Sequence, residues 1–409
     1  MTQKPRMLPV VEFVLLQAML ISLMAISTDM MLPALGQIAT DLRLDQPSDA
    51  ALIVSVLFFG FAVGQIFSGP LSDSFGRKPV IMAGLGVFLI GCLMALFSTS
   101  WTMMLVGRLL QGLGISAPRI AGLALVRDQY EGRAMARIMS FVITVFIVVP
   151  VVAPSLGQAV ILVGNWRMIF AFILAQGIVA AIWFYVRQPE TLMPEDRRGF
   201  SVGEVTRGAV MALSYRRTLG YTLVTGATMG GLLAYLSSAQ LIFQITYDAG
   251  AAFPLYFGAG ALSVGVASVT NARIVMRLGM RLLAWRALLV STAASALFLS
   301  WAVLHNGVPP FWSFMAWLIV IFFCLGMSLG NLNSLALEPL GKLAGIGAAI
   351  VGALSTFIGL PVGWIAAEAY AGGVGPLAVV FTGTGLASVA LIWWTERGDV
   401  SPKSATNLG

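Results

Sequence analysis

Two charged residues stand inside long apolar runs of the sequence, where an isolated charge is costly. Asp29 lies in the run STDMMLP at residues 27–33, and Arg108 lies in GRLLQG at residues 107–112. Ionisable residues at such positions are expensive to bury and usually serve a function. A buried aspartate near an arginine can take up and release a proton, so the pair is a candidate for proton coupling. The two side chains could instead form a permanent ion pair that fixes helix packing.

The expected depth of these side chains also favours a shared site. The two runs are expected to cross the membrane as helices in opposite directions. Asp29 and Arg108 then both lie roughly 10 Å below the same membrane surface. Gln111 lies one turn beyond Arg108, and Arg119 lies about three turns beyond it on the same helix face. We predict that Asp29 and Arg108 couple protons and that all four side chains contact the substrate. Arg119 could instead extend to the membrane surface or pack between helices.

Neutral polar residues in the apolar runs of the second half could extend this site. They are Tyr235, Gln240, Asn331 and Asn333. Such groups either line a cavity or hydrogen-bond between helices. We treat them as candidates for substrate binding, with interhelical hydrogen bonding as the alternative.

A short charged run, GPLSDSFGRKP at residues 69–79, separates two long apolar runs. Its notable positions are Gly69, Asp73, Gly76, Arg77 and Lys78. The acid would end one helix and the two bases would begin the next. This placement predicts a charge latch that holds the cytoplasmic face shut, with a simple topology anchor as the alternative.

A further run, VPVVAPSLG at residues 149–157, contains the paired prolines Pro150 and Pro154 and the small residue Gly157. Proline removes an amide donor and kinks a helix, and small residues permit close helix contact. We predict that this run interrupts the fifth helix and acts as a pivot, with ordinary packing as the alternative.

The composition indicates that these residues are positioned by membrane helices. Of 409 residues, 58% are hydrophobic and only 10% are charged, whereas a soluble protein has about 25% charged residues. Apolar runs of roughly 20 residues, the length that crosses the hydrocarbon as a helix, recur along the chain. The fold class is therefore an all-α polytopic membrane protein. The twelve predicted spans are 9–36, 49–71, 79–98, 102–125, 137–162, 166–187, 218–243, 253–276, 282–304, 311–335, 343–367 and 374–395.

The distribution of bases predicts the orientation. Nearly all of them fall on the side of the two termini, including Lys4, Arg6, Arg198 and Lys403, and by the positive-inside rule both termini are cytoplasmic. The formal net charge of +7 follows from this asymmetry and requires no nucleic-acid partner.

The longest polar stretch divides the chain into two halves of six spans. Residues 1–187 form one predicted six-helix bundle, 188–217 a cytoplasmic linker and 218–409 a second, pseudo-symmetric bundle. Residues 276–281 echo residues 73–78, although Met276 replaces Asp73, which predicts an acidic half of the latch in the first bundle only. Paired six-helix bundles are typical of transporters, with the substrate site between them near the membrane midplane.

The sequence disfavours an enzyme or a channel. It has one histidine, His305, in a predicted loop, and two isolated cysteines, Cys92 and Cys324. These residues provide no metal site, no disulfide framework and no nucleophile–base pair. Two pseudo-symmetric halves also suit a rocking motion better than a permanent pore.

These motifs resemble those of the major facilitator superfamily. Residues 69–78 match its pattern G-x-L-x-D-x-x-G-R-K/R, residues 108–112 resemble the drug-exporter pattern R-x-x-Q-G, and residues 149–157 are similar to its antiporter motif. The runs TDMMLP at 28–33, LVRD at 125–128 and NWRMIF at 165–170 are similar to the Bcr/CflA subfamily of drug:proton antiporters.

This resemblance implies alternating access driven by the proton gradient, without a cofactor. It implies a coupling role for Asp29, a substrate or relay role for Arg108, and gating roles for Asp73 and Arg77. The implied partners are a small-molecule substrate, protons and the lipid bilayer. The resemblance also implies that the protein works as a monomer in the bacterial inner membrane. It implies that the protein exports chloramphenicol-, florfenicol- or bicyclomycin-type drugs.

Two departures from the subfamily bear on the cargo. Met31 stands where many relatives have tyrosine, and Arg119 adds a cation where relatives have small or apolar residues. The extra cation favours neutral, zwitterionic or anionic compounds over lipophilic cations. An exporter or proton symporter of an endogenous metabolite is the alternative function, although the antiporter-like run at 149–157 argues against uptake.

Overall fold

The computed structural model describes residues 8–197 and 199–397, and these residues form helices without any strand. Lys4, Arg6, Arg198 and Lys403, four of the bases behind the predicted orientation, lie outside the described residues. The first half contains α1 (Val10–Asp29), α2 (Leu35–Asp41), α3 (Leu52–Phe75), α4 (Arg77–Leu96), α5 (Trp101–Gln129), α6 (Gly132–Val163) and α7 (Trp166–Arg187). The second contains α9 (Arg216–Gln240), α10 (Phe253–Leu278), α11 (Met280–Leu304), α12 (Phe311–Leu337), α13 (Ala344–Glu368) and α14 (Gly375–Arg397).

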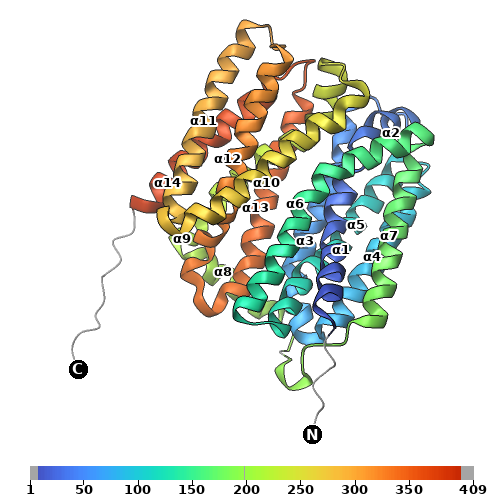
Figure 1. Cartoon of the computed structure of the whole chain (residues 1–409), viewed down its shortest axis with the longest axis vertical. Helices are drawn as coiled ribbons and strands as arrows, with labels where there is room; N and C mark the ends of the chain where they lie inside the picture. Colours follow the sequence, from blue (N-terminus) through green and yellow to red (C-terminus); the bar gives the residue numbers. More distant parts are fainter. Residues whose placement is uncertain (1–7, 198, 398–409) are drawn as a thin grey trace.

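The predicted membrane fold is confirmed. Among the described residues, eleven helical segments are long and apolar enough to cross a membrane, and a twelfth apolar stretch, Val148–Val163, lies within α6. The chain is therefore a multi-pass membrane protein. The helices of each half lie together, with the first half and the second half on opposite sides of the molecule in Figure 1.

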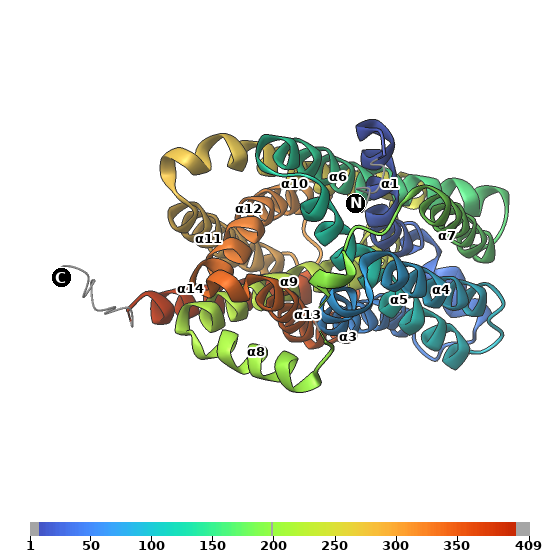
Figure 2. The same ribbon diagram turned by 90° about the horizontal axis from the view of Figure 1, so that it is seen from below.

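Two helix pairs join the halves. α3 packs against α13, and α6 packs against α10. Figure 2 shows the same pairs from below, with α3 beside α13 and α6 beside α10. The boundary between the halves is thus built from the second and fifth spans of the first half and their counterparts in the second.

The first span is broken where one continuous run was expected. α1 ends at Asp29, a short 3-10 turn covers Leu32–Ala34, and α2 begins at Leu35. Pro33 explains the break, because proline has no N–H to donate to the carbonyl four residues earlier. The break places Asp29 at a helix terminus, where the last carbonyl groups lack partners within the helix.

The predicted interruption of the fifth span is wrong. α6 runs without a break from Gly132 to Val163 and contains both Pro150 and Pro154. Neighbouring helices can stabilise a proline-containing membrane helix, which is why prolines alone do not fix a break.

The segment between the halves contains a helix that the polar composition did not predict. It forms a 3-10 turn at Pro194–Asp196 and the amphipathic α8 (Val202–Ser214). α8 lies against α9 and α13, and Val205 and Ala212 are buried. We call this end of the molecule the linker side and the opposite end the far side.

Candidate functional site

Asp29 ends α1 at the break in the first span and is buried, with a relative exposure of 6%. In the part of the chain that the structure describes, its side chain takes part in no hydrogen bond or ion pair. A buried carboxyl group without a partner pays a desolvation penalty in its charged form. Such a group is suited to exchanging a proton rather than to bracing the fold.

Arg108 of α5 is fully buried and is held by neutral acceptors from three helices. Its Nη2 donates to the Ser27 carbonyl at 2.8 Å, its Nε donates to the Ile53 carbonyl at 3.2 Å, and its Nη1 donates to Gln111 Oε1. The permanent ion pair with Asp29, the alternative considered from the sequence, is not formed in this structure. Ser27 belongs to the last turn of α1, so Arg108 satisfies one of the carbonyl groups that the helix end leaves free.

Among the described residues, two buried polar atoms beside Arg108 have no hydrogen-bond partner, Ser27 Oγ and Gln111 Nε2. The amide of Gln17 is also unpaired, but it lies about three turns away along α1, beside Gly122 of α5. Unpaired buried polar groups are rare in native proteins and mark places where a water molecule or a ligand fits. Sequence reasoning identified Gln111 but missed Ser27; the signal available was a polar residue inside an apolar span.

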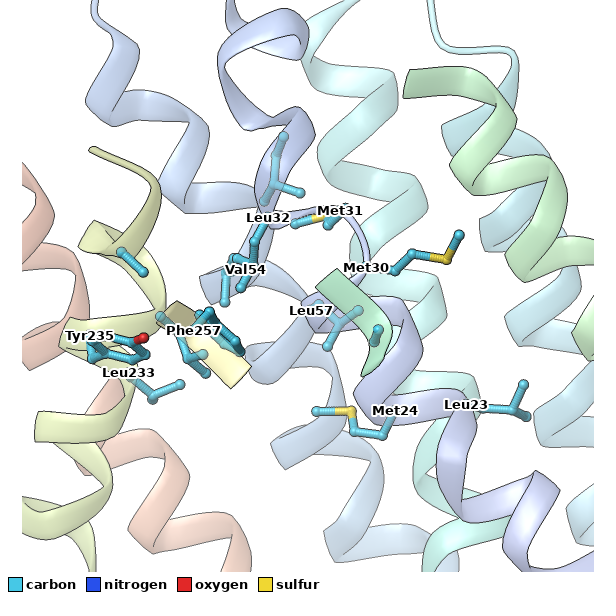
Figure 3. Packing of buried hydrophobic residues seen from close by; sticks show 14 of the residues in the cluster. Leu23, Met24, Met30, Met31, Leu32, Val54, Leu57, Leu233, Tyr235 and Phe257 are labelled. Carbon is cyan, nitrogen blue, oxygen red and sulfur yellow. The ribbon is translucent and has the colours of Figure 1, made fainter. Parts of the chain in front are cut away.

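Tyr235 of α9 brings the second half to the same place. Its ring stacks on Phe257 at 5.5 Å and meets Phe322 edge-on at 4.7 Å between ring centroids, and it is almost completely buried. Its hydroxyl has no hydrogen-bond partner in the described part of the chain. Figure 3 shows Tyr235 and Phe257 beside Val54 and Leu57 of α3, in one continuous hydrophobic cluster.

The Asp29 carboxyl group lies close enough to Tyr235 to act on it electrostatically. α9 packs against the 3-10 turn that follows Asp29, so this acid of the first half and this hydroxyl of the second belong to neighbouring elements at the boundary. Among the described residues, neither side chain takes part in a hydrogen bond or ion pair. Of the predicted site residues, Asp29, Arg108, Gln111 and Tyr235 are gathered around the break in the first span.

The remaining candidates lie elsewhere. Gln240, half-buried at the end of α9, faces Gly36 across the boundary: its Nε2 lies 3.1 Å from the position that a Cβ on Gly36 would take. Asn331 donates to Asn271 Oδ1 at 2.8 Å, which joins α12 to α10. Asn331 therefore hydrogen-bonds between helices, the alternative to a role in substrate binding. Asn333 is exposed.

Arg119 is half-buried on α5, about three turns from Arg108 toward the linker side. It is not part of the group around the break.

α6 connects the break in the first span to the other half. A Cβ on Gly157 would lie 1.8 Å from the carbonyl oxygen of Met30, so only glycine allows α6 this close to the break. One and a half turns earlier, Val151, between Pro150 and Pro154, approaches Gly258 of α10. The predicted pivot residues therefore lie between Asp29's helix end and the second half.

The charged run at residues 69–78 forms a network on the linker side. Arg77 is buried and pairs with Asp73, donates through Nε to Asp128 Oδ2 at 3.0 Å, and donates through Nη1 to Ser72 Oγ at 2.9 Å. These contacts join α3, α4 and α5. The two carboxylates neutralise the positive charge of the buried Arg77 side chain.

Glu190, which sequence reasoning missed, completes this network from the linker. Its carboxylate accepts hydrogen bonds at 3.0 Å from the backbone N–H groups of both Arg77 and Lys78, the first residues of α4. An acid at a helix N-terminus satisfies unpaired donors and the helix dipole. Gly76, with φ +104°, makes room for it, because a Cβ there would lie 2.4 Å from Glu190 Oε2.

Lys78 lies at the edge of the network and contacts the end of α7. Its Nζ donates to the Tyr185 carbonyl at 2.7 Å. Gly69 lies in α3, two turns before Gly76, with only ordinary contact distance to Ile120. All partners of the charged run among the described residues thus belong to the first half and the linker.

The second half has its own acidic partners, which corrects the expectation of an acidic latch in the first half only. Arg281, at the start of α11, lies 3.4 Å from Glu396 and 3.8 Å from Glu338. Tyr221 also donates to Glu396. The acids come from the ends of α12 and α14, not from the position of Met276, so an alignment of the two loops could not reveal them.

Comparison with known proteins gives the fold and its family. The D-xylose-proton symporter matches with a TM-score of 0.74 at 14% identity, covering 94% of this chain and 97% of that one. The human organic anion transporter MFSD10 matches with a TM-score of 0.70 at 19% identity, covering 94% and 100%. At these identities the likeness concerns the fold alone.

Sequence relatives cover most of the chain. A bicyclomycin resistance protein homolog of Haemophilus influenzae is 28% identical over 365 residues, 87% of this chain and 89% of the relative. Multidrug resistance protein D of Escherichia coli is 25% identical over 394 residues, 94% and 95% of the two chains. Residues 18–363 match the sequence profile of the Major Facilitator Superfamily. This chain, a membrane transporter and not an enzyme, belongs to the Major Facilitator Superfamily.

Proposed function

We propose that this transporter exports small, moderately hydrophobic compounds in exchange for protons. Chloramphenicol, florfenicol and bicyclomycin are the first candidates for its cargo. In this proposal a single chain acts in the bacterial inner membrane, with the linker side and both termini in the cytoplasm. The resistance names of the two relatives support export, and the shared family supports alternating access.

The observation that carries the proposal is the position of Asp29. Among the described residues it is a buried acid without a partner, placed at a helix break against which α9 of the opposite half packs. A charge at this boundary favours an arrangement in which the acid is solvated, and its protonation removes that preference. Proton binding can therefore bias the relative position of the two halves.

Arg108 has a supporting role in this proposal. Because it is fixed by Ser27, Ile53 and Gln111, it holds α1, α3 and α5 together while Asp29 changes its protonation state. Its positive charge remains close to the site, which favours neutral or anionic cargo over cations.

The linker-side network supports gating by stabilising the first half as a rigid body. Arg77, Asp128 and Glu190 join α4 and α5 to the linker. Contacts of this kind within one bundle allow it to move as a rigid unit relative to the other bundle, as in rocking transporters.

The test is drug accumulation in bacteria that lack their own exporters. We expect expression of the protein to lower the cellular content of at least one of the three compounds, and a protonophore to reverse this effect. Asp29→Asn should abolish the effect at equal membrane abundance, whereas Asp45→Asn, an exposed acid of the far side, should not. A rise in accumulation would indicate proton-driven uptake and contradict export.

A further inference from the structure

A groove opens on the linker side of the second half, away from the boundary between the halves. It lies between the start of α11 and the end of α14 and has a volume of about 490 Å³. Its charged lining consists of Arg281, Arg397 and Glu396, Tyr221 adds a hydroxyl, and its apolar lining includes Leu282, Trp285 and Trp393. The groove thus combines two guanidinium groups with aromatic and aliphatic side chains.

The carboxylate in the groove is already neutralised. Glu396 Oε1 accepts from Tyr221, and Glu396 Oε2 lies 3.4 Å from Arg281. Arg397 is exposed, and its guanidinium lies flat against Trp393, 3.8 Å from the ring centroid. Among the described residues, Arg397 makes no hydrogen bond or ion pair. Its donors therefore have no acceptor in this part of the chain and are available for an anion. Both carboxylates near the groove, Glu396 and Glu338, pair with Arg281, so Arg397 is the guanidinium without a carboxylate partner among the described residues.

An apolar path leads from the groove along the membrane face of both helices. On α11, Leu282 and Leu289 are seven residues apart and both are exposed; on α14, Leu386 and Trp393 have the same spacing and are also exposed. A separation of seven residues places side chains on one helix face. In a membrane protein these faces contact acyl chains, and tryptophan is enriched at the level of the headgroups.

We propose that this groove binds an anionic glycerophospholipid of the leaflet on the linker side. Arg397 and Arg281 contact the phosphate, Trp393 and Trp285 flank the headgroup, and an acyl chain follows the Leu282–Leu289 and Leu386–Trp393 faces. Two cations and a belt of aromatic side chains beside an apolar path complement each part of such a lipid. Arg216 does not line the groove; its guanidinium lies 4.5 Å from the Trp394 ring and donates to the Trp394 carbonyl, which adds a base near the end of α14.

The test is lipid binding to the detergent-solubilised full chain, measured by native mass spectrometry. The protein is titrated with phosphatidylglycerol, with phosphatidylcholine of the same acyl chains, or with glycerol 3-phosphate. We expect one phosphatidylglycerol to bind more tightly than phosphatidylcholine, and Arg397→Gln to weaken it roughly five- to tenfold, the effect of one cation at a membrane surface. Glycerol 3-phosphate should not displace it, because it lacks the acyl chains.

Arg277→Gln is the matched control. Arg277 is an exposed base in the last turn of α10, outside the groove, and its loss changes the net charge equally. Trp393→Leu provides a second variant that keeps the charge and removes the aromatic platform, and it should also weaken binding. Equal affinities for the two lipids, equal effects of Arg397→Gln and Arg277→Gln, or displacement by glycerol 3-phosphate would each overturn the proposal.

Discussion

The Arg108 guanidinium donates to the backbone carbonyl of Ser27 at 2.8 Å and makes no contact with the carboxylate of Asp29, two residues further along α1. The arginine therefore stabilises the end of a helix, and within the described part of the chain the aspartate forms no ion pair. We therefore propose different roles for the two charges of the membrane interior. Arg108 holds three helices together through its hydrogen bonds, and Asp29 exchanges protons in the proposed function.

The bracing role of Arg108 predicts that lysine cannot replace it. A lysine ammonium is a compact charge on a flexible stem and cannot reach Ser27, Ile53 and Gln111 together. We expect Arg108→Lys to destabilise the purified protein by about 2–5 kcal/mol, the range for breaking a buried charged network. Thermal unfolding in detergent measures this, with Arg277→Lys as an exposed control; equal melting temperatures for both variants would contradict the bracing role.

The close approach of α6 to the break in the first span predicts a strong effect at Gly157. Gly157→Ala would place a Cβ 1.8 Å from the Met30 carbonyl oxygen, so the two helices would have to separate. We expect a loss of about 1–3 kcal/mol, typical of overpacking. Gly86→Ala is the control: a Cβ there meets nothing within 4 Å, and alanine should leave stability unchanged or slightly higher.

The two halves provide an internal comparison for the linker-side network. Gly76 and Gly279 both have positive φ, +104° and +80°, but only Gly76 faces Glu190. Gly279→Ala should cost only the backbone strain of about 1–3 kcal/mol, because φ +80° with ψ +151° is a conformation essentially restricted to glycine. Gly76→Ala should cost more, because it also displaces Glu190 from the start of α4. Melting temperatures of the two variants compare these effects, and equal losses would show that the Glu190 contact contributes nothing.

Removing the Tyr235 hydroxyl should affect proton coupling without lowering the stability of the protein. Its hydroxyl has no partner, so Tyr235→Phe should leave the melting temperature unchanged or raise it slightly. If the hydroxyl serves Asp29, the same variant should slow pH-driven transport several-fold. Tyr256→Phe, in the aromatic cluster of the same half, is the matched control. Full pH-driven transport by Tyr235→Phe would exclude the hydroxyl from coupling.

The membrane fold was predictable because apolar length and composition specify a spanning helix directly. Asp29 and Arg108 were identifiable for the same reason, since a charge is conspicuous inside such a run. Their partners were not predictable: Arg108 binds backbone carbonyls of Ser27 and Ile53, and a sequence does not show which carbonyls a helix break leaves free. Glu190 lies in the polar linker, where one more acid carries no distinguishing signal.

The continuity of α6 illustrates the same limit. Pro150 and Pro154 remove hydrogen bonds locally, but the packing of α6 between α1 and α10 keeps the helix intact. Tertiary contacts of this kind are set by side chains distant in sequence. Residue patterns therefore predicted the elements of the fold more completely than the contacts between them.

The central claim, that Asp29 couples proton movement to transport, is tested most directly with Asp29→Asn in proteoliposomes. Substrate exchange at equal pH on both sides reports binding and alternating access, and transport under an imposed pH gradient reports coupling. For a compound that the wild type transports, we predict that Asp29→Asn retains exchange and loses acceleration by the gradient, while Asp45→Asn keeps both. Acceleration of Asp29→Asn transport equal to that of the wild type would contradict the claim.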